Sequence, residues 1–450
     1  MKKRWIIMMT VLVIFCTIGV FTPETAGLWE PDAKVNYTDV AWILTATIFV
    51  LMMTPGLSFF YGGMVRQKNV ISTILQSFIA MGVISVLWVV FGFSLAFGND
   101  IGGFVGNPAT FFMFNGVGAK TNALLSPTIP LALYALFQMK FAIITPSLIT
   151  GSFAERVRFS AYMVFMILFC IFVYCPLAHW TWHPDGFLRQ LGVVDFAGGI
   201  VVHASSGVAA FTGAIFLGRR CDRGGDRNPA NIALVILGAS MLWLGWFGFN
   251  AGSSLAANGV AVKAFLNTNT ASATAMLIWV FFDCLRGRKP SAMGAAIGAV
   301  VGMVAITPSA GYVTVGQSMF IALITTIVCN VAVHWKNYNS VDDALDVFPT
   351  HGVGGIVGTI LTGVFVNGLV VGNVHIFLIH LLAIVIVCTY TFVVTYALYW
   401  ITDRMIPMRV SVKSEHIGLD ISQHDESYGI RFGERELAEY LEVEKEAEIK

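Results

Sequence analysis

Charged side chains are scarce in this sequence. Asp, Glu, Lys and Arg make up 12% of its 450 residues, whereas 56% of the residues are hydrophobic and the mean hydropathy is +0.75. A water-soluble domain cannot bury so much apolar surface, so the composition predicts a chain embedded in a lipid bilayer. The net charge of only +1 argues against nucleic acid as a partner, because binding phosphates requires a basic face.

Metal and redox motifs are also missing. The seven cysteines are scattered, mostly within apolar runs, and none has the spacing of a zinc or thiol-redox site. We interpret them as packing residues and expect neither a metal nor a cofactor. Because no nucleophile or cofactor motif accompanies the histidines, we do not expect an enzyme. The cysteines are Cys16, Cys170, Cys175, Cys221, Cys284, Cys329 and Cys388.

The first residues resemble a secretory signal peptide. Met-Lys-Lys-Arg is followed by an apolar run over residues 5–21 and then by Thr-Pro-Glu-Thr-Ala, which predicts cleavage near Ala26. Glu24 lies close before that point, where a small residue is preferred. An uncleaved additional helix is therefore the alternative.

Eleven further apolar stretches are long enough to cross a bilayer, most of them near the ~20 residues that a spanning helix needs. They predict an all-α polytopic membrane protein. We place the spans at residues 39–62, 70–98, 128–153, 158–179, 195–218, 230–253, 264–285, 291–307, 313–334, 348–368 and 374–402.

Basic residues are distributed unevenly over the connecting loops. Loops after odd-numbered spans hold most of them, for example Arg156 and Arg220, whereas loops after even-numbered spans hold only Lys120, Arg189 and Lys263. Because cations accumulate in cytoplasmic loops, we expect the odd loops and the tail from residue 403 to be cytoplasmic and the mature N-terminus to be outside.

Two segments of the chain repeat the same spacing. Asp195 precedes His203 by eight residues in span five, and Asp343 precedes His351 by eight residues in span ten. The two segments lie five spans apart and therefore run in opposite directions through the membrane. This predicts an inverted five-helix repeat of spans 1–5 and 6–10, an eleventh helix outside it, and a functional site near the midplane.

His203 and His351 are the sharpest functional candidates. An ionisable side chain in a spanning helix is costly and normally faces the bundle interior or a water-filled path. Gly207 follows His203 by four residues and Gly355 follows His351 by four, so the two helices can approach closely. We expect the imidazoles to meet at the centre of a pore. A purely structural hydrogen-bonded pair is the alternative, and a metal site would lack a third ligand.

Two aromatic helix faces accompany the histidines. Aromatic rings attract cations by ~0.5–2 kcal/mol, so a cage at the outer end of a pore would recruit a small monovalent cation. Lipid-facing or interfacial positions are the ordinary alternative. Helical spacing places Phe137 with Phe141 on one face and Trp246, Phe249 and Ser253 on another, while Trp182 is expected in the outer loop before span five.

Acidic residues precede both histidine spans. Asp195 at the start of span five is expected to cap the helix, to attract cations, or both, and the group Asp342, Asp343 and Asp346 before span ten is expected to cap similarly. Glu155 is interpreted as part of an ordinary cytoplasmic turn. The histidines at span ends, where water is available, receive no functional assignment: His179, His334, His375 and His380.

Together these residues resemble the ammonium transporter family (Amt and Mep proteins, with Rh proteins as distant relatives), in particular its bacterial Amt-type members. The similarity extends from about residue 39 to residue 428, and its most specific piece is DFAGGIVVHASSGVAA at 195–210. Further matches are FFYGGMVRQKN at 59–69, FAIITPSLITGSFAERVRFSAY at 141–162, WLGWFGFNAGS at 243–253 and HGVGGIVGTILTGVF at 351–365.

The resemblance implies roles for individual residues. Trp182, Phe141 and Ser253 would form the outer ammonium site, with Phe137 and Trp246 as further candidates from the two aromatic faces. Phe141 and Phe249 would stack as a gate beneath that site. His203 and His351 would share a hydrogen bond inside the pore. Asp195, and Asp343 by its matching position, would support the site from outside the pore.

The resemblance also implies a homotrimer with one pore through each subunit. The tail segment GLDISQHDESYG at 418–429 is similar to a cytoplasmic motif of the family that couples subunits and receives a PII-type nitrogen-status protein. The acidic stretch 434–450 is expected to be a solvated extension, with a helix as the alternative. The resulting division is a signal peptide at 1–26, a transmembrane domain at 27–402 and a cytoplasmic tail at 403–450.

These observations predict ammonium or ammonia transport across the cytoplasmic membrane. A cation in a narrow apolar lumen pays a large desolvation cost, so ammonium is expected to lose its proton near the gate and to pass the histidines as ammonia. Two questions stay open: whether a proton also crosses, and whether the protein is instead an ammonium sensor on the same fold. Lys140, where the family has an uncharged residue, is expected to point away from the lumen.

Overall fold

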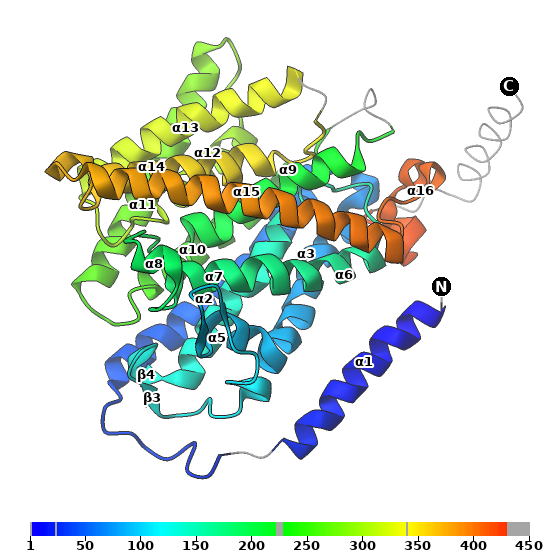
Figure 1. Cartoon of the computed structure of the whole chain (residues 1–450). Helices are drawn as coiled ribbons and strands as arrows, with labels where there is room; N and C mark the ends of the chain where they lie inside the picture. Colours follow the sequence, from blue (N-terminus) through cyan, green and yellow to red (C-terminus); the bar gives the residue numbers. More distant parts are fainter. Residues whose placement is uncertain (1, 23–24, 222–227, 339–340, 430–450) are drawn as a thin grey trace, which may run out of the picture.

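The structure, a computed structural model, describes residues 2–22, 25–221, 228–338 and 341–429 (Figure 1). Ten helices within these residues are long and apolar enough to cross a membrane. One of them is α1 (Lys2–Phe21), and the other nine coincide with predicted spans. The two remaining predicted spans are present as α11 (Gly259–Leu285) and the shorter α12 (Ala292–Ile306). The prediction of eleven spans after the N-terminal segment is therefore confirmed.

Several spans combine an α-helix with a short π-helical segment. The spans, in chain order, are α2 (Tyr37–Met64); α3 (Val70–Leu87) with η2 (Trp88–Gly92) and α4 (Phe93–Phe97); α5 (Leu131–Ile149); α6 (Phe159–Phe169) with η4 (Cys170–Tyr174) and α7 (Cys175–Trp182); η5 (Gly199–Ala204) with α9 (Ser205–Leu217); α10 (Ile232–Gly252); α11; α12; α13 (Val315–Tyr338); η6 (Phe348–Val353) with α14 (Gly354–Phe365); and α15 (Val374–Met405).

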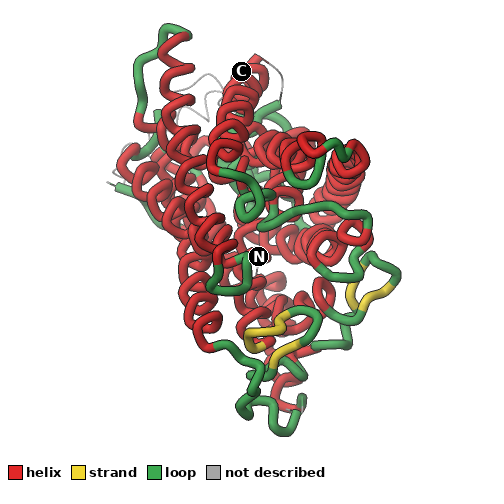
Figure 2. The backbone as a smooth tube through the Cα atoms, turned by 90° about the vertical axis from the view of Figure 1, so that its left-hand side faces the viewer, coloured by secondary structure: helices red, strands yellow, loops and turns green. Residues whose placement is uncertain are grey.

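Short elements occupy the two ends of the bundle. The strands β3 (Thr121–Asn122) and β4 (Ser126–Pro130) lie with α8 (Phe187–Gln190) at the left of Figure 1, the end that faces the viewer in Figure 2. A second antiparallel pair joins β1 (Asp100–Ile101) to β2 (Val105–Gly106). The remaining short helices are η1 (Gln67–Asn69), η3 (Phe112–Phe114), η7 (Leu369–Val371), α16 (Val412–Ile417) and η8 (Asp420–His424).

Polar caps define where many helices begin. The Asn36 side chain accepts hydrogen bonds from the N–H groups of Thr38 and Asp39 at the start of α2. Asn231 and Asn258 do the same at α10 and α11. The first N–H groups of a helix lack partners within it, so these side chains fix the points at which apolar runs become helical.

The first spans of the two predicted repeats pack directly on each other. Glycines line the contact between α2 and α10: a Cβ at Gly56 would lie 3.3 Å from the Gly238 carbonyl oxygen, and one at Gly63 would lie 2.6 Å from that of Asn231. Small residues of this kind allow two membrane helices to approach backbone to backbone. The last spans of the repeats, which carry the two histidines, also contact each other, so corresponding elements of the two halves are paired across the bundle.

Helix α15 lies outside this pairing and covers one side of the bundle. It contacts α6, α9 and α14, and Figure 1 shows it crossing the length of the molecule. Helix α1 is separated from the other helices in the same view, and its most apolar stretch has no buried residue. The Trp5 and Phe159 ring centroids are 6.5 Å apart, and a Cβ at Gly19 would meet the Met113 side chain, so α1 extends along the bundle surface.

The structure corrects several predicted boundaries. The fourth span continues to Trp182, so this side chain belongs to the end of α7 rather than to a loop. The helical part of the fifth span begins at Gly199, because residues 195–198 form its cap. The segment between α4 and α5 forms the two strand pairs, which no hydrophobic pattern predicted. The acidic stretch 434–450 lies outside the described residues.

Candidate functional site

A narrow apolar cavity lies between the two halves of the bundle. Its only ionisable lining side chains, among the residues that the structure describes, are His203 and His351. Polar groups are therefore concentrated at one point of an otherwise hydrophobic lumen. The lining residues are Met53, Leu57, Phe60, Ile144, Leu148, Val202, His203, Leu242, Trp246, Phe249, Val300 and His351.

The two histidine rings meet in this cavity. Their Nδ1 atoms are 3.3 Å apart, their ring centroids are 5.4 Å apart, and both side chains are buried. Two neutral imidazoles can form this contact only if one Nδ1 carries the hydrogen and the other accepts it. The donating ring then has a bare Nε2 and the accepting ring an Nε2–H. Nε2 of His203 has no protein partner, so it is available to a molecule in the lumen.

Reciprocal close contacts bring the two histidine segments together. A Cβ at Gly207, four residues after His203, would overlap the backbone of Gly352. A Cβ at Gly355, four residues after His351, would lie 2.8 Å from the backbone nitrogen of Ala204. Each glycine thus meets the residue that follows the opposite histidine. This equivalence is what the predicted antiparallel arrangement of spans five and ten requires.

The two aspartates cap the π-helical segments that carry the histidines. The Asp195 carboxylate accepts from the N–H groups of four successive residues, Gly198 to Val201, at 2.7–3.2 Å. Asp343 Oδ2 accepts from the Phe348 N–H at 2.8 Å, the same distance as between Asp195 Oδ2 and the equivalent Ile200 N–H. Of the two roles left open by the sequence, capping is the one that the contacts of Asp195 support.

Aromatic rings connect the buried histidines to the half-buried Trp182 side chain. Phe141 and Phe249 are stacked obliquely, with centroids 4.3 Å apart, and both are buried. The Phe249 ring lies 5.9 Å from the His203 ring, and Trp182 meets Phe141 edge to face at 5.8 Å. The rings therefore form a continuous row from a half-buried indole to the buried imidazoles, in the order Trp182, Phe141, Phe249, His203.

Trp182 and Ser253 are both partly exposed. The Trp182 indole Nε1 donates to the Asp195 carbonyl at 3.0 Å, which fixes the ring plane. The Ser253 hydroxyl donates to the Phe249 carbonyl at 2.7 Å. Because its hydrogen is used in this bond, the hydroxyl oxygen can only accept from a further group, as a cationic N–H donor would require.

Trp246 and Phe137 are buried, unlike Trp182 and Ser253. Trp246 is stacked on His203 at 5.3 Å inside the cavity, and its indole N–H donates to the Thr307 hydroxyl at 3.0 Å. Phe137 packs edge to face on Phe141 at 5.0 Å and against Gly252, so it supports the Phe141 ring. The shared helix faces were predicted, but helical spacing does not determine depth along the pore.

Lys140 is mostly buried and is not among the residues that line the cavity. Its ammonium group lies 3.7 Å from the sulfur of the adjacent Met139, which is a weak acceptor. Because Lys140 is not one of the lining residues, the structure agrees with the expectation that its side chain points away from the lumen.

Two histidines left without a role by the sequence are in fact fully buried. His179 contacts the Ala96 carbonyl through Nδ1 and Asp100 Oδ1 through Nε2, each at 2.9 Å. His380 contacts the loop before the fifth span. Their positions near span ends suggested access to water, but the folded segments that connect the spans cover them. No sequence spacing indicates these contacts, because the partners are distant in the chain.

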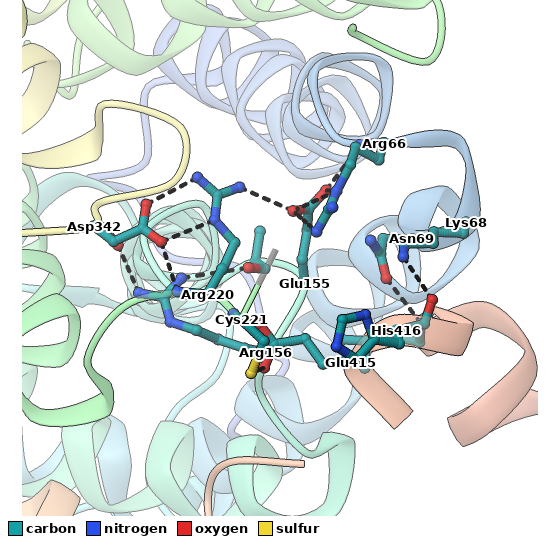
Figure 3. Close-up of polar contacts among 12 residues, drawn as sticks. Arg66, Lys68, Asn69, Glu155, Arg156, Arg220, Cys221, Asp342, Glu415 and His416 are labelled. Atoms are coloured by element: carbon teal, nitrogen blue, oxygen red, sulfur yellow. Dashed lines mark hydrogen bonds and ion pairs between the residues drawn. The ribbon is translucent and has the colours of Figure 1, made fainter. Parts of the chain in front are cut away.

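Glu155 and Arg156 are also buried, which corrects the interpretation of Glu155 as part of an ordinary cytoplasmic turn. Figure 3 shows the polar network around them. Glu155 is paired with Arg66 at 2.8 Å and with Arg220 at 2.9 Å. Arg220 also pairs with Asp342 at 2.9 Å, and Arg156 donates to the Asp342 carbonyl at 2.6 Å. Four separate loops are thus joined at one end of the bundle.

The charges in this network stabilise one another. Burial alone would raise the pKa of Glu155, but hydrogen bonds from Arg66 and the charge of Arg220 outweigh it and the pKa lies below its ordinary value. Asp342 shows the same balance, and the Arg220 guanidinium holds its pKa well below the usual range. Burial lowers the pKa of Arg156 to about 10, so it stays protonated at neutral pH.

The C-terminal segment rests against the same end of the bundle. The Asp420 carboxylate accepts from the N–H groups of Ile71 and Ser72 at the start of α3, at 3.0 and 2.8 Å. The Leu419 N–H donates to Asn69 at 2.8 Å, and Lys68 donates to the His416 carbonyl at 2.6 Å (Figure 3). These contacts tie the family-like tail motif to the loop between the first two spans.

Arg220→Ala is expected to destabilise the protein by about 3 kcal/mol, because it leaves the buried Asp342 carboxylate without its main partner and the buried Glu155 carboxylate with Arg66 alone. The matched control is Arg288→Ala. Arg288 is 53% exposed and lies 3.6 Å from Asp283, and exposed pairs contribute about 1 kcal/mol or less. Thermal unfolding of the detergent-solubilised proteins gives the comparison. Equal shifts in unfolding temperature for the two variants would show that the buried Arg220 network contributes no more to stability than an exposed ion pair.

The fold and the site define a multi-pass helical membrane protein with an apolar, histidine-containing lumen between two inverted halves. The model of the Ammonium Transporter Family matches residues 41–428. The chain therefore belongs to the ammonium transporter family, as the sequence motifs predicted. Its relatives are named as transporters, which also confirms the expectation that it is not an enzyme.

Sequence and structure agree on this membership. A putative ammonium transporter of Methanothermobacter thermautotrophicus is 42% identical over 405 residues, 87% of this chain and 98% of that protein. An ammonium transporter of Bacillus subtilis is 42% identical over 400 residues, 86% and 97% of the two chains. The crystal structure of Candida albicans Mep2 has a TM-score of 0.79 at 33% identity, covering 84% and 87%. A structure described as a sensor Amt protein has a TM-score of 0.80 at 28% identity, covering 86% and 98%.

Proposed function

We propose that this protein moves ammonium across a membrane as ammonia, through the lumen between its two halves. The observation that carries the proposal is the row of side chains from Trp182 to His351, which begins half-exposed and ends in a buried, apolar cavity. Aromatic faces and a hydroxyl acceptor suit a small cation with N–H donors. The apolar interior behind them suits only a neutral molecule.

The proposed sequence of events follows from desolvation. Ammonium binds at the outer site, formed by Trp182, Phe141 and Ser253, where water is still available. Passing the gate formed by Phe141 and Phe249 would strip the cation of water with no counter-charge, so it gives up a proton there and continues as ammonia. His203 and His351 then offer one bare nitrogen and one N–H to ammonia, which has both a lone pair and hydrogens.

The proposal excludes potassium by the same argument. Potassium has no proton to lose, and two neutral imidazoles do not replace its hydration shell. A proton released at the gate either returns to the outside or crosses separately along the imidazoles. In the first case the transport is electroneutral, and in the second it is electrogenic.

A sensor is the second candidate. The described sensor Amt structure shares the fold at 28% identity over most of both chains, so the fold alone does not separate the two functions. A sensor would bind ammonium at the outer mouth with little or no flux.

The deciding experiment uses purified protein in proteoliposomes on a solid-supported membrane. An ammonium jump is expected to evoke a current or, for electroneutral transport, a change in internal pH read by an enclosed dye. An equal potassium jump is expected to evoke neither. Calorimetric binding of ammonium without current or pH change would favour the sensor and would exclude transport by this chain.

The setting of the protein is proposed from the family resemblance and the charge distribution. The basic network of Arg66, Arg156 and Arg220 lies at one end of the bundle, which supports placing that end and the tail in the cytoplasm. We place the protein in the cytoplasmic membrane as a homotrimer, with residues 1–26 as a signal peptide and 27–402 as the transmembrane domain. A PII-type protein would bind at the cytoplasmic face and the 403–450 tail.

A further inference from the structure

His380 has a defined tautomer. It lies on α15, the helix outside the inverted repeat, and its side chain is fully buried. Its Nδ1 is 2.8 Å from the Ile376 carbonyl oxygen, and its Nε2 is 3.1 Å from the Val194 backbone nitrogen. A carbonyl only accepts and a backbone N–H only donates. The hydrogen must therefore be on Nδ1, and Nε2 must be a bare acceptor for the Val194 N–H.

The segment that His380 holds is the one that positions the outer site. Val194 directly precedes Asp195, whose carbonyl oxygen accepts the indole N–H of Trp182. The Asp195 carboxylate caps the segment that carries His203, and the next residue, Phe196, donates to the Pro308 carbonyl at 3.0 Å. The ring orientation of Trp182 thus depends on where the Asp195 backbone lies, and the bond from His380 is one of the anchors of that backbone.

We propose that His380 is a positioning residue for the outer cation site: its Nε2 fixes the Val194–Asp195 backbone, which in turn fixes the Trp182 indole. The inference rests on the proposed function, because it assigns cation recruitment to Trp182. It gives α15 a part in the pore, although this helix contributes no residue to the cavity lining. The gate rings Phe141 and Phe249 are on α5 and α10, outside the segment that His380 anchors.

The proposal predicts an effect on affinity rather than on maximum flux. Loss of the acceptor leaves the part-buried Val194 N–H without its partner, and the backbone must shift to satisfy it. His380→Leu is expected to raise the ammonium concentration for half-maximal current by about five- to ten-fold. Maximum current should change less than two-fold, since the lumen and histidine pair are untouched.

Rescue and control variants separate this role from simple packing. His380→Gln places an amide oxygen near the position of Nε2 and is expected to return the half-maximal concentration to within about two-fold of wild type. His380→Asn keeps a polar group but is too short to reach Val194, so it should behave like His380→Leu. If the leucine variant fails to fold, the glutamine–asparagine pair still makes the comparison. His375→Leu, an exposed position on the same helix, is the control and should match wild type.

A double-mutant cycle tests whether the effect passes through Trp182. In a Trp182→Leu background, His380→Leu is expected to add little further shift, because the group that it positions is gone. Additive shifts would overturn the inference, as would an unchanged half-maximal concentration, a fall in maximum current alone, or a glutamine variant no better than asparagine. If the wild-type protein shows no flux, the transport proposal is refuted instead. Calorimetric titration with ammonium would then test whether the binding affinities of the His380 variants follow the order expected for the half-maximal concentrations.

Discussion

His203→Ala and His351→Ala are each expected to reduce the selectivity for ammonium over potassium by at least about ten-fold, or to abolish transport. Each variant removes one half of the buried Nδ1–Nδ1 contact and leaves a void beside the other imidazole. Water that enters this void would solvate a cation inside the lumen, so the exclusion of potassium by desolvation would fail. Currents evoked by ammonium and potassium jumps on the same sensor give the ratio.

Two comparisons keep this result interpretable. His375→Ala, at an exposed position of α15, should leave both currents unchanged. Thermal unfolding of each variant in detergent shows whether a lost current reflects a lost fold. If both pore variants carried ammonium with unchanged selectivity, the assignment of the histidine pair to the transport path would be wrong.

Asp195→Ala is expected to destabilise the protein by on the order of 3 kcal/mol or more and to abolish transport. The substitution leaves four buried N–H groups, those of Gly198 to Val201, without their acceptor. The π-helical segment that they begin also carries His203, so its loss displaces the histidine pair and the backbone below Trp182 together. Yield of folded protein, unfolding temperature and ammonium current measure the effect.

The asparagine variants provide a sharper contrast. Asp195→Asn replaces one accepting oxygen by an NH₂ group that faces N–H donors, so it should lose most of the current even where it folds. Asp343→Asn retains an oxygen for the Phe348 N–H, and the second carboxylate oxygen of Asp343 has no hydrogen-bond partner. The loss of current in Asp343→Asn should therefore be clearly smaller than in Asp195→Asn. Equal losses at the two positions would show that formal charge, and not the number of capped N–H groups, determines their importance.

The histidine segments show how far spacing alone can predict a site. Matching intervals from Asp195 to His203 and from Asp343 to His351 indicated paired, antiparallel segments, and the structure shows their reciprocal glycine contacts. Spacing did not reveal that both segments are π-helical, because this local distortion depends on how neighbouring backbone is packed. It also placed Trp246 with the outer cage, whereas the ring is stacked on His203.

Residues whose partners are distant in the chain were missed for a different reason. Glu155, Arg220 and Asp342 come from three loops, and nothing in any single loop indicates that they meet. His380 looked accessible because it lies near a span end, yet the segment before the fifth span folds over it. In both cases the burial of the side chains depends on which loops cover the ends of the helices.

The sequence by itself determined that the chain is a multi-pass helical membrane protein, how many spans it has, and which residues resemble an ammonium transporter. It could do so because bilayer thickness fixes the length of an apolar run and because family motifs are local. Only the tertiary structure decided the depth of each ring along the lumen, the burial of Glu155 and His380, and the anchoring of Trp182 through Asp195. These depend on contacts between elements far apart in the chain, which neither hydropathy nor periodicity encodes.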